Sequence, residues 1–451
     1  MARAQKGYRC RECGWETVGY VGRCQLCGEW NVLEPYVRNP GRSTAAASTA
    51  EATPARVVEL ADVAGAEEDR FPTTIDEFDR VLGGGIVPGS LALVGGDPGV
   101  GKSTLMLQAA ARLAAAGRRV AYLCGEESPR QVRLRAGRLG VGGDGISLIA
   151  ETSLDAALEA ARSLDPDLLI VDSIQSVYCE GIESRLGGPA QLGEAGARLL
   201  SWAKTTETAT FMTGHVTKSG EVAGPRLLEH LVDVVLYFEG AEHGALRLLR
   251  ATKNRFGATD EVGVFEMTGA GLASVENPSA AFLDQEAEQA SGCAVTAVIE
   301  GSRPLALEVQ ALAVSSSLAT PRRVSSGLET ARLHLLLAVL SRRVGLNAGD
   351  MDVVATVSGG LRLREPAADL AVAVALASAI RDRPVEQGVA FLGEVALSGS
   401  VRPVGQPGRR LAELARMGFR ACVAAPNTQP VEGIEVWPVR HVRDAVAMAL
   451  A

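Results

Sequence analysis

The chain has 451 residues, 47% of them hydrophobic, so it is too long for one ordinary core and too apolar to be disordered throughout. Its net charge of −8 excludes a histone-like coat of positive charge but leaves room for a local basic channel. No apolar run approaches the ~18 residues of a membrane span, and the stretch MARAQKGYRC lacks the apolar core of a secretory signal. We therefore expect a cytoplasmic protein of two or three domains, whose eight cysteines are thiols or metal ligands.

The first predicted element is a metal module over residues 1–33. Its spacing C-x₂-C-x₁₀-C-x₂-C is formed by Cys10, Cys13, Cys24 and Cys27. Two such pairs deliver four thiolates to one tetrahedral ion, and Zn²⁺ is the usual occupant in the cytosol; a redox pair and an iron–sulfur centre are the alternatives. A piece this short cannot build a core, so we expect the metal to supply its folding energy. Trp15 and Trp30 are predicted to form its small core, with stacking platforms as the alternative.

Residues 34–70 are rich in Ala, Ser, Thr and Pro without a clear period, which is typical of a linker. From residue 71 to 277, apolar runs such as SLALVGG, RRVAYLCGEE, DLLIVDS and TATFMTGHV alternate with helical stretches. This alternation predicts a parallel α/β sheet. After residue 278 the rhythm changes to an α+β pattern, with CAVTAVIEG and PLALEVQALAV as a hairpin and VAFLGEVALSGSV as a later strand.

A phosphate-binding loop follows the predicted strand SLALV and opens a helix. The G-x₄-G-K-[ST] stretch and the threonine after it consist of Gly96, Asp97, Pro98, Gly99, Val100, Gly101, Lys102, Ser103 and Thr104. Glycines let successive N–H groups point inward, and the helix N-terminus favours an anionic phosphate. We expect Lys102 to reach the β- and γ-phosphate oxygens of ATP and Ser103 to bind Mg²⁺.

The partners of a nucleotide hydrolase follow in the same region. Asp172 ends an apolar strand and is suited to hold Mg²⁺. Glu126 and Glu127 end the neighbouring strand, and one of them is expected to polarise the attacking water, while either can also be a salt-bridging carboxylate. Thr213 or His215 is a candidate sensor of the γ-phosphate.

In this order, the C4 knuckle, GGDPGVGKST, YLCGEES, LLIVDSIQ and TKNRFG resemble the bacterial RadA (Sms) family of DNA repair proteins over nearly the whole chain. KNRFG is a motif of that family and is far more specific than the phosphate loop alone. The resemblance implies a RecA-like ATPase core in a hexameric ring. It also implies action on single-stranded and branched DNA in homologous recombination, including branch migration, with a RecA-type recombinase as partner.

The resemblance divides the chain into four parts and identifies the last with the proteolytic domain of Lon. These parts are a C4 zinc finger at 1–33, a linker at 34–70, a RecA-like ATPase domain at 71–277 and a Lon-protease-like domain at 278–451. Ala367 stands where the Lon-type serine is expected and Gly408 where the lysine is expected, so we expect no Ser–Lys peptidase. Ring packing and a basic surface for DNA are expected instead, the latter from residues such as Arg322, Arg323, Arg402, Arg409 and Arg410.

The two cations of KNRFG have three interpretations. In the RecA-like ring that the resemblance implies, the nucleotide lies between subunits and a cation of the neighbour completes the stabilisation of its γ-phosphate. Residues i and i+2 of a strand share a face, so Lys253 and Arg255 can together supply such cations, and we expect them to act in trans on the phosphates of the adjacent subunit. The rival interpretation is that they hold DNA in the ring channel, and the structural one is that Arg255 pairs with Asp260 or Glu261. These cations also stand out by type, since only five of the 45 basic residues are lysines.

The segment HVTKSGEVAGPRLLEHL is predicted to be a mobile DNA-facing loop, with Lys218 and Arg226 meeting phosphates and Gly220 and Gly224 allowing motion; a solvated polar loop is the alternative. Two other functions compete with a DNA-translocating ATPase. One is a RecA-fold regulator of the KaiC type that does not act on DNA. The other is an ATP-dependent protease, which Ala367 and Gly408 disfavour.

Overall fold

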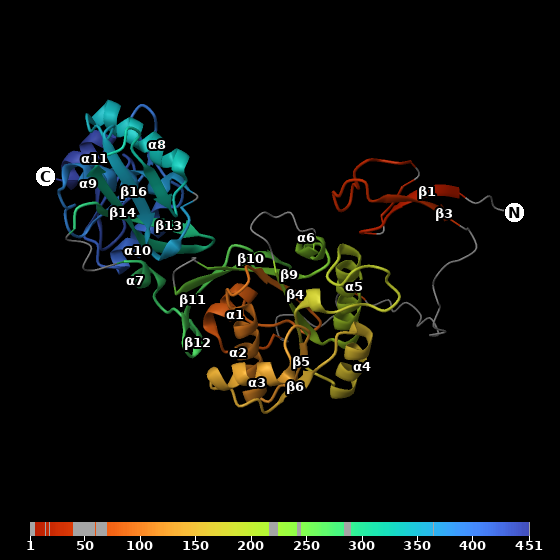
Figure 1. Cartoon of the computed structure of the whole chain (residues 1–451). Helices are drawn as coiled ribbons and strands as arrows, with labels where there is room; N and C mark the ends of the chain where they lie inside the picture. Colours follow the sequence, from red (N-terminus) through yellow and green to blue (C-terminus); the bar gives the residue numbers. More distant parts are fainter. Residues whose placement is uncertain are drawn as a thin grey trace. The chain divides into compact units, whose positions relative to one another are not determined.

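The computed structural model describes residues 5–13, 15–17, 19–38, 59, 70–215, 224–240, 245–283, 290–363 and 365–450 (Figure 1). The chain divides into two compact units, each with its own core. The first comprises Met1–Glu239, Leu249–Thr259 and Thr268–Leu272, and the second comprises Gly240–Leu248, Asp260–Met267 and Ala273–Ala451. The three boundaries between the four parts predicted from the sequence stay predictions.

The metal module is a three-stranded antiparallel sheet with the order β2-β1-β3. Its strands are β1 (Gln5–Cys10), β2 (Glu16–Thr17) and β3 (Leu33–Arg38). Its buried cluster is small: Cys10, Cys24, Val32 and Leu33, with Trp15 packed against them. So little apolar surface is buried that cysteines make up half of this cluster of described residues.

The sheet of the first unit has six parallel strands in the order β9-β4-β8-β7-β5-β6. These strands are β4 (Leu91–Gly96), β5 (Val120–Cys124), β6 (Ile146–Ile149), β7 (Leu168–Asp172), β8 (Ala209–His215) and β9 (Val234–Gly240). Beyond β9 follow β10 (Leu246–Asn254), β11 (Val262–Thr268) and β12 (Gly271–Ser274). The alternation of strands and helices in the sequence correctly predicted the parallel sheet.

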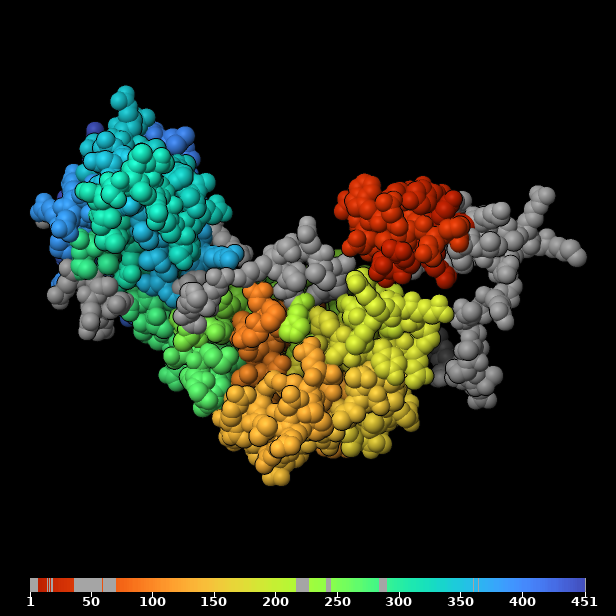
Figure 2. All heavy atoms as spheres, in the orientation of Figure 1, coloured from red at the N-terminus to blue at the C-terminus, as the bar shows by residue number. Residues whose placement is uncertain are grey.

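Helices cover both faces of this sheet (Figure 1). They are α1 (Asp76–Leu82), α2 (Lys102–Ala115), α3 (Pro129–Arg138), α4 (Leu154–Leu164), α5 (Pro189–Thr206) and α6 (Gly224–Glu229), with a short 3₁₀ turn η2 (Ile174–Ser176). Apolar residues of α4, α5 and α6 pack with β4, β5 and β7 into one core cluster. On the visible surface, the orange part belongs to the chain from α1 to β6 and the yellow part to the chain from α4 to β8 (Figure 2).

The second unit contains a seven-stranded sheet with the order β15-β16-β14-β13-β17-β20-β21. Its strands are β13 (Cys293–Glu300), β14 (Arg303–Ser315), β15 (Arg323–Ser326), β16 (Met351–Val357), β17 (Val389–Leu392), β20 (Ala421–Ala424) and β21 (Glu435–Pro438). The predicted hairpin is confirmed, because β13 and β14 pair antiparallel from Cys293↔Gln310 to Glu300↔Arg303.

The helices and turns of the second unit include one almost wholly buried helix, α9. The elements are α7 (Pro278–Phe282), α8 (Thr330–Val339), the π-turn η4 (Leu340–Val344), η5 (Ser358–Gly360), η6 (Pro366–Ala368), α9 (Asp369–Arg381), α10 (Pro407–Arg416) and α11 (Val442–Ala449). Every residue of α9 from Asp369 to Ala379 is buried. This explains why its sequence, DLAVAVALASA, shows no polar stripe.

The predicted single strand VAFLGEVALSGSV is wrong. The stretch forms three short strands: β17, β18 (Glu394–Val395) and β19 (Val401–Arg402). β18 and β19 pair with each other as a separate hairpin. The chain turns back between them because Gly399 adopts a left-handed φ of 82° and Ala396 N–H donates to Ser400 O.

The prediction that Arg410 belongs to a basic surface is also wrong. Its side chain is 3% exposed and forms two hydrogen bonds of 2.6 Å with the carboxylate of Glu365. It also donates to Ala297 O at 2.8 Å. A second ion pair lies at the start of α9. Arg332 donates hydrogen bonds to both carboxylate oxygens of Asp369, whose side chain is 3% exposed. Each of these two ion pairs therefore has a buried member and belongs to the packing of the second unit, not to a surface for DNA.

We predict that Arg332→Met destabilises the second unit by about 3–5 kcal/mol, because it leaves the Asp369 carboxylate buried without its cation. Burial already raises the pKa of Asp369, and Arg332 counteracts that rise. Urea unfolding of the full chain measures the effect. Arg402→Met is the matched control: its pair with Glu394 is exposed, so the expected loss is under about 1 kcal/mol. Equal unfolding midpoints for the two variants would contradict the prediction.

No helix in the part of the chain that the structure describes combines the length and apolarity needed to cross a bilayer.

Candidate metal centre and nucleotide site

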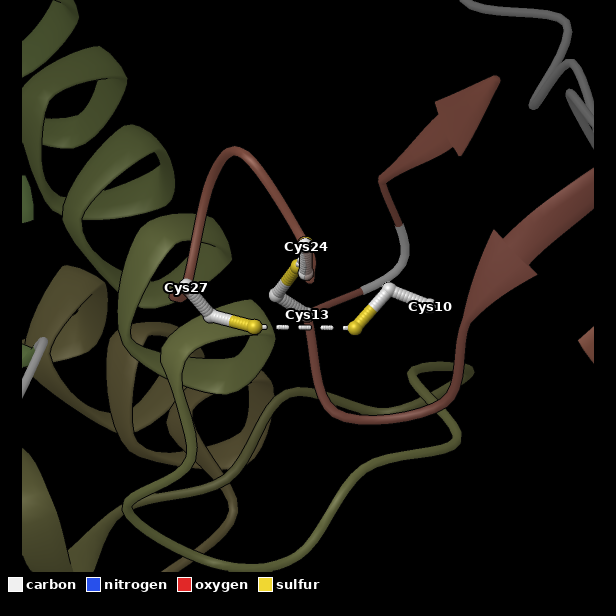
Figure 3. A group of neighbouring side chains, drawn as sticks. All are labelled: Cys10, Cys13, Cys24 and Cys27. Carbon is white, nitrogen blue, oxygen red and sulfur yellow. Dashed lines mark hydrogen bonds between the residues drawn. The ribbon is translucent and has the colours of Figure 1, made fainter. Parts of the chain in front are cut away.

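The four cysteines of the N-terminal module converge on one point (Figure 3). Their Sγ atoms all lie within 4.8 Å of one another; those of Cys10 and Cys27 are 3.6 Å apart and those of Cys13 and Cys24 are 3.5 Å apart. Tetrahedral zinc with Zn–S bonds near 2.3 Å requires sulfur atoms about 3.8 Å apart. The four-thiolate donor set and its spacing therefore fit a structural Zn²⁺ site.

Local backbone geometry explains why the second knuckle forms. Gly28 adopts a left-handed φ of 76°, and its N–H donates to Cys24 O at 2.9 Å. Arg23 fixes the same turn by donating from Nε to Gly28 O at 2.7 Å. Trp15 packs in the core as predicted, whereas the prediction for Trp30 is wrong, because its side chain is 67% exposed beside Arg23.

We predict that each chain binds one zinc ion and that Cys24→Ser abolishes this binding. Without zinc, residues 5–38 should become sensitive to protease, because the core of the module is too small to hold the fold by itself. Elemental analysis and limited proteolysis with and without a chelator measure both effects. Cys293→Ser, a half-buried cysteine outside the module, should keep its zinc. Iron in place of zinc, or a module that resists protease without metal, would contradict this.

The phosphate loop connects β4 to α2. Gly96 adopts a φ of 150°, and a Cβ there would lie 2.4 Å from Phe238 O, so only glycine fits. Gly101 caps α2 without a side-chain hydrogen bond, which leaves first-turn N–H groups of the helix for an anion. The predicted loop and helix are thus arranged as a phosphate site requires.

Lys102 is the first residue of α2, and its side chain, which reaches back to the loop, is 5% exposed. Its Nζ donates to Gly96 O at 2.8 Å and to Asp97 O at 3.0 Å, and lies 3.2 Å from His215 Nδ1. Burial lowers the pKa of the ammonium, while the nearby carboxylates, Asp172 first, oppose that shift. An ammonium held by carbonyl oxygens of its own loop is placed to exchange them for phosphate oxygens.

Asp172 is the most densely bonded carboxylate of the site. Its Oδ1 accepts hydrogen bonds from Ser103 Oγ at 3.0 Å and Thr213 Oγ1 at 2.6 Å, and its Oδ2 accepts from the Tyr122 hydroxyl. Serine hydroxyl and carboxylate oxygens are ligands that Mg²⁺ accepts, so Ser103 and Asp172 fit the predicted magnesium role. Burial and the Asp172 charge raise the pKa of Tyr122, which keeps its hydroxyl a donor.

The two glutamates after β5 lie in different surroundings. Glu127 is ion-paired with Arg135 of α3, whose guanidinium also lies 3.9 Å from Asp172. Glu126 is 42% exposed, accepts a hydrogen bond from Ser173, and lies 3.4 Å from His215 Nε2. Motif reading did not reveal Tyr122 or Arg135, because neither stands in a recognised phosphate-binding pattern.

The two candidate γ-phosphate sensors separate in the structure. Thr213 is 1% exposed and directs its hydroxyl to Asp172. His215 is 39% exposed and lies between Lys102 and Glu126. His215 is therefore the better placed of the two. The predicted DNA-facing loop that follows it lies outside the described residues at 216–223, including Lys218 and Gly220, and the side chain of Arg226 is likewise not described.

KNRFG contains three residues that fix its turn and two cations. Asn254 Nδ2 donates to Leu82 O at 3.3 Å at the end of α1, and its Oδ1 accepts from Phe256 N at 2.9 Å. Arg70 donates to Phe256 O, and a Cβ on Gly257 would lie 3.2 Å from Gly83 Cα. Asn254, Phe256 and Gly257 thus fix the turn against α1, which leaves Lys253 and Arg255 as its two cations.

Those two cations have local partners at the end of α6 and just before β9. Lys253 Nζ donates to Glu229 O at 2.8 Å, and burial followed by the charge of Arg255 lowers the pKa of Lys253. Arg255 is 57% exposed and its Nη1 lies 3.2 Å from Asp233 Oδ1. The predicted pairing of Arg255 with Asp260 or Glu261 is wrong: Arg255 bonds Asp233, and Glu261 accepts from Ser302 Oγ at 2.7 Å.

The phosphate loop and KNRFG lie at opposite edges of the parallel sheet. Asp233 N–H donates to Leu91 O at 2.9 Å, so the Arg255 partner sits where β4 begins. The phosphate loop follows Gly96, where β4 ends. At ~3.3 Å per residue, the two edges are separated by roughly 17 Å. Lys253 and Arg255 therefore lie far from the phosphate loop of the same chain.

Three family models match the chain: an AAA domain over residues 54–221, a rubredoxin metal binding domain over 8–35 and the Lon protease (S16) C-terminal proteolytic domain over 351–448. The chain is 44% identical to the DNA repair protein RadA of Bacillus subtilis, with 100% of both sequences covered. It is 45% identical to that of Pseudomonas aeruginosa over 99% of both, and 42% to that of Listeria monocytogenes over 100% of both.

The chain belongs to the RadA family of DNA repair proteins. The predicted family and its three-part architecture are confirmed, with a zinc ribbon, an AAA-type ATPase domain and a Lon-type C-terminal domain. As a RadA-family member with an AAA domain, it is an ATP-binding hydrolase of DNA repair.

Proposed function

We propose that this chain is a DNA-dependent ATPase of homologous recombination. In this proposal it binds single-stranded and branched DNA and promotes branch migration as a hexameric ring, together with a RecA-type recombinase. The observation that carries it is the placement of Lys253 and Arg255 at the sheet edge opposite the phosphate loop. Cations that cannot serve their own nucleotide are suited to serve that of a neighbour in a head-to-tail ring.

Within one subunit, the residues around the phosphate loop have separable tasks. Lys102 and the N-terminus of α2 bind the phosphates of ATP, and Ser103 and Asp172 hold Mg²⁺, which supplies positive charge to the β- and γ-phosphate oxygens when bound. Tyr122 and Thr213 keep the Asp172 carboxylate in one orientation. Glu126 accepts a proton from the water that attacks the γ-phosphorus, and ADP leaves.

The choice of Glu126 over Glu127 rests on their contacts. Arg135 neutralises Glu127 and holds it toward α3. Glu126 has no arginine or lysine partner among its described contacts and faces His215, which neighbours Lys102. A general base must be free to accept a proton near the reacting phosphate, and Glu126 meets this requirement better.

We predict that Glu126→Gln lowers kcat for ATP hydrolysis at least 10²-fold, roughly the lower end for loss of a general base, while ATP binding persists. Glu127→Gln should lower kcat much less, because the lost group is an ion-pair partner. Steady-state hydrolysis and equilibrium binding of a fluorescent ATP analogue measure the two effects. A Glu127 variant that is the more impaired of the pair would reverse the assignment.

The second unit contributes no peptidase in this proposal. Ala367 is buried in η6, and its carbonyl accepts a hydrogen bond from Gly393 N at 3.0 Å. The chain contains no lysine after Lys253, so the whole Lon-type region lacks the amine of a Ser–Lys pair. Ring packing and contact with DNA remain the roles proposed for it.

We predict that single-stranded DNA stimulates ATP hydrolysis and that Lys253→Ala and Arg255→Ala abolish the stimulation while ATP binding stays near wild type. The reason is that both cations stabilise charge on a phosphate bound by another subunit. A phosphate-release assay with and without an oligonucleotide measures this. Hydrolysis that no DNA stimulates would favour the KaiC-type alternative, and casein degradation would favour the protease.

A mixing experiment tests the trans arrangement directly. Lys102→Ala subunits keep the KNRFG cations, and Arg255→Ala subunits keep the phosphate loop. Each is expected to be inactive alone, and an equal mixture should recover activity, because about a quarter of head-to-tail interfaces then combine an intact loop with an intact arginine. A mixture as inactive as its components would exclude action in trans.

A further inference from the structure

Asp233 is a buried carboxylate shared by two cations. Its side chain is 2% exposed, while those of Lys204 and Arg255 are 47% and 57% exposed. Its Oδ2 accepts from Lys204 Nζ at 2.8 Å and from Leu91 N at 3.1 Å. Its Oδ1 accepts from Arg255 Nη1 at 3.2 Å. The two oxygens thus hold different partners, and one negative charge faces two positive ones.

Lys204 is tied to this position from two sides. It stands in the last turn of α5, and its Nζ lies 5.9 Å from the centre of the Phe256 ring, the aromatic residue of KNRFG. Lys253, by contrast, directs its ammonium to the carbonyl oxygens of Glu229 and His230. Among the described residues, Lys204 is therefore the cation that stays on Asp233 if Arg255 moves.

This arrangement matters because removing the last counter-ion of a buried charge costs folding free energy. Leaving one member of a buried ion pair alone is strongly destabilising. If Arg255 were the sole counter-ion of Asp233, its departure toward a phosphate would carry that full penalty. With Lys204 on Oδ2, the carboxylate stays neutralised and hydrogen-bonded, and the half-exposed guanidinium of Arg255 can leave Oδ1.

We propose that Lys204 is a positioning residue of the ATPase: it serves as the standing counter-ion of Asp233 and so allows Arg255 to move between Asp233 and the triphosphate of the adjacent subunit. This inference rests on the proposed role of Arg255 in trans. It adds a residue outside the phosphate loop and outside KNRFG to the machinery of hydrolysis. Lys204 acts through Arg255 and touches no reacting atom.

The test compares Lys204→Met with Lys204→Arg in the full chain under DNA stimulation. Lys204→Met should lower kcat by about tenfold, the size expected when a close charge pair is broken, with KM changed by less than about twofold. Lys204→Arg should retain activity near wild type, because a guanidinium also pairs with Asp233. Arg162→Met is the matched control: Arg162 is a 64% exposed cation over Trp202, on α4, and its loss should leave kcat unchanged.

A second variant separates positioning from a structural role. Asp233→Asn in the Lys204→Met background removes the charge that retains Arg255, so it should raise kcat above that of the single Lys204→Met variant. Melting temperatures of all variants show whether they fold. A purely structural Lys204 predicts the opposite, since the double variant would lose stability and kcat together. Wild-type kcat in Lys204→Met, or equal loss in Lys204→Arg, would overturn the inference.

Arg255→Ala is measured alongside, so that the two ideas fail separately. If Arg255→Ala hydrolyses ATP like the wild type, the proposed role of Arg255 fails and this inference fails with it. If Arg255→Ala is inactive and Lys204→Met is normal, the role of Arg255 stands and only the inference about Lys204 is lost.

Discussion

The common direction of the six parallel strands determines where charge gathers in the ATPase region. Because β4 and β9 run the same way, the phosphate loop at the end of β4 and Asp233 at the start of β9 lie at opposite edges of one sheet. Each edge then collects its own set of charged groups: Lys102, Asp172 and Glu126 at one, and Lys204, Asp233 and Arg255 at the other. The polarity of a parallel sheet thus keeps the nucleotide site apart from the cations that the proposal assigns to a neighbour.

Both edges use the same physical device, a poorly exposed aspartate with several donors. Asp172 accepts from Ser103, Thr213 and Tyr122, and Asp233 accepts from Lys204, Arg255 and a backbone N–H. Several hydrogen-bond donors on one carboxylate fix its orientation and offset the free-energy cost of burying its charge. The difference is exposure: the donors of Asp172 come mostly from the interior, whereas the cations on Asp233 are half in water.

The sequence predicted those parts of the fold and site that depend on local pattern. The cysteine spacing, the phosphate loop and the strand ending in Asp172 are short motifs whose geometry follows from neighbouring residues. Asp233, Tyr122 and Arg135 could not be found this way, because their importance comes from partners distant in the chain. Leu91 and Asp233, for example, are 142 positions apart. Arg410 was misread for a related reason: an arginine in an amphipathic helix gives no sign that a carboxylate meets it in the interior. The prediction of one strand over residues 389–401 was wrong because the turn within it depends on the left-handed conformation of Gly399.

The separation of the two edges also determines how many complete catalytic sites an assembly of subunits contains. If every catalytic seam combines the phosphate loop of one protomer with the arginine of the next, an open arc has one seam fewer than it has protomers, and its two ends carry one idle loop and one idle arginine. Closing the ring would therefore add one complete catalytic site without adding a protomer. Hydrolysis per chain would then report on closure itself, and a strand of DNA that favours the closed circle would raise the rate without touching the phosphate loop.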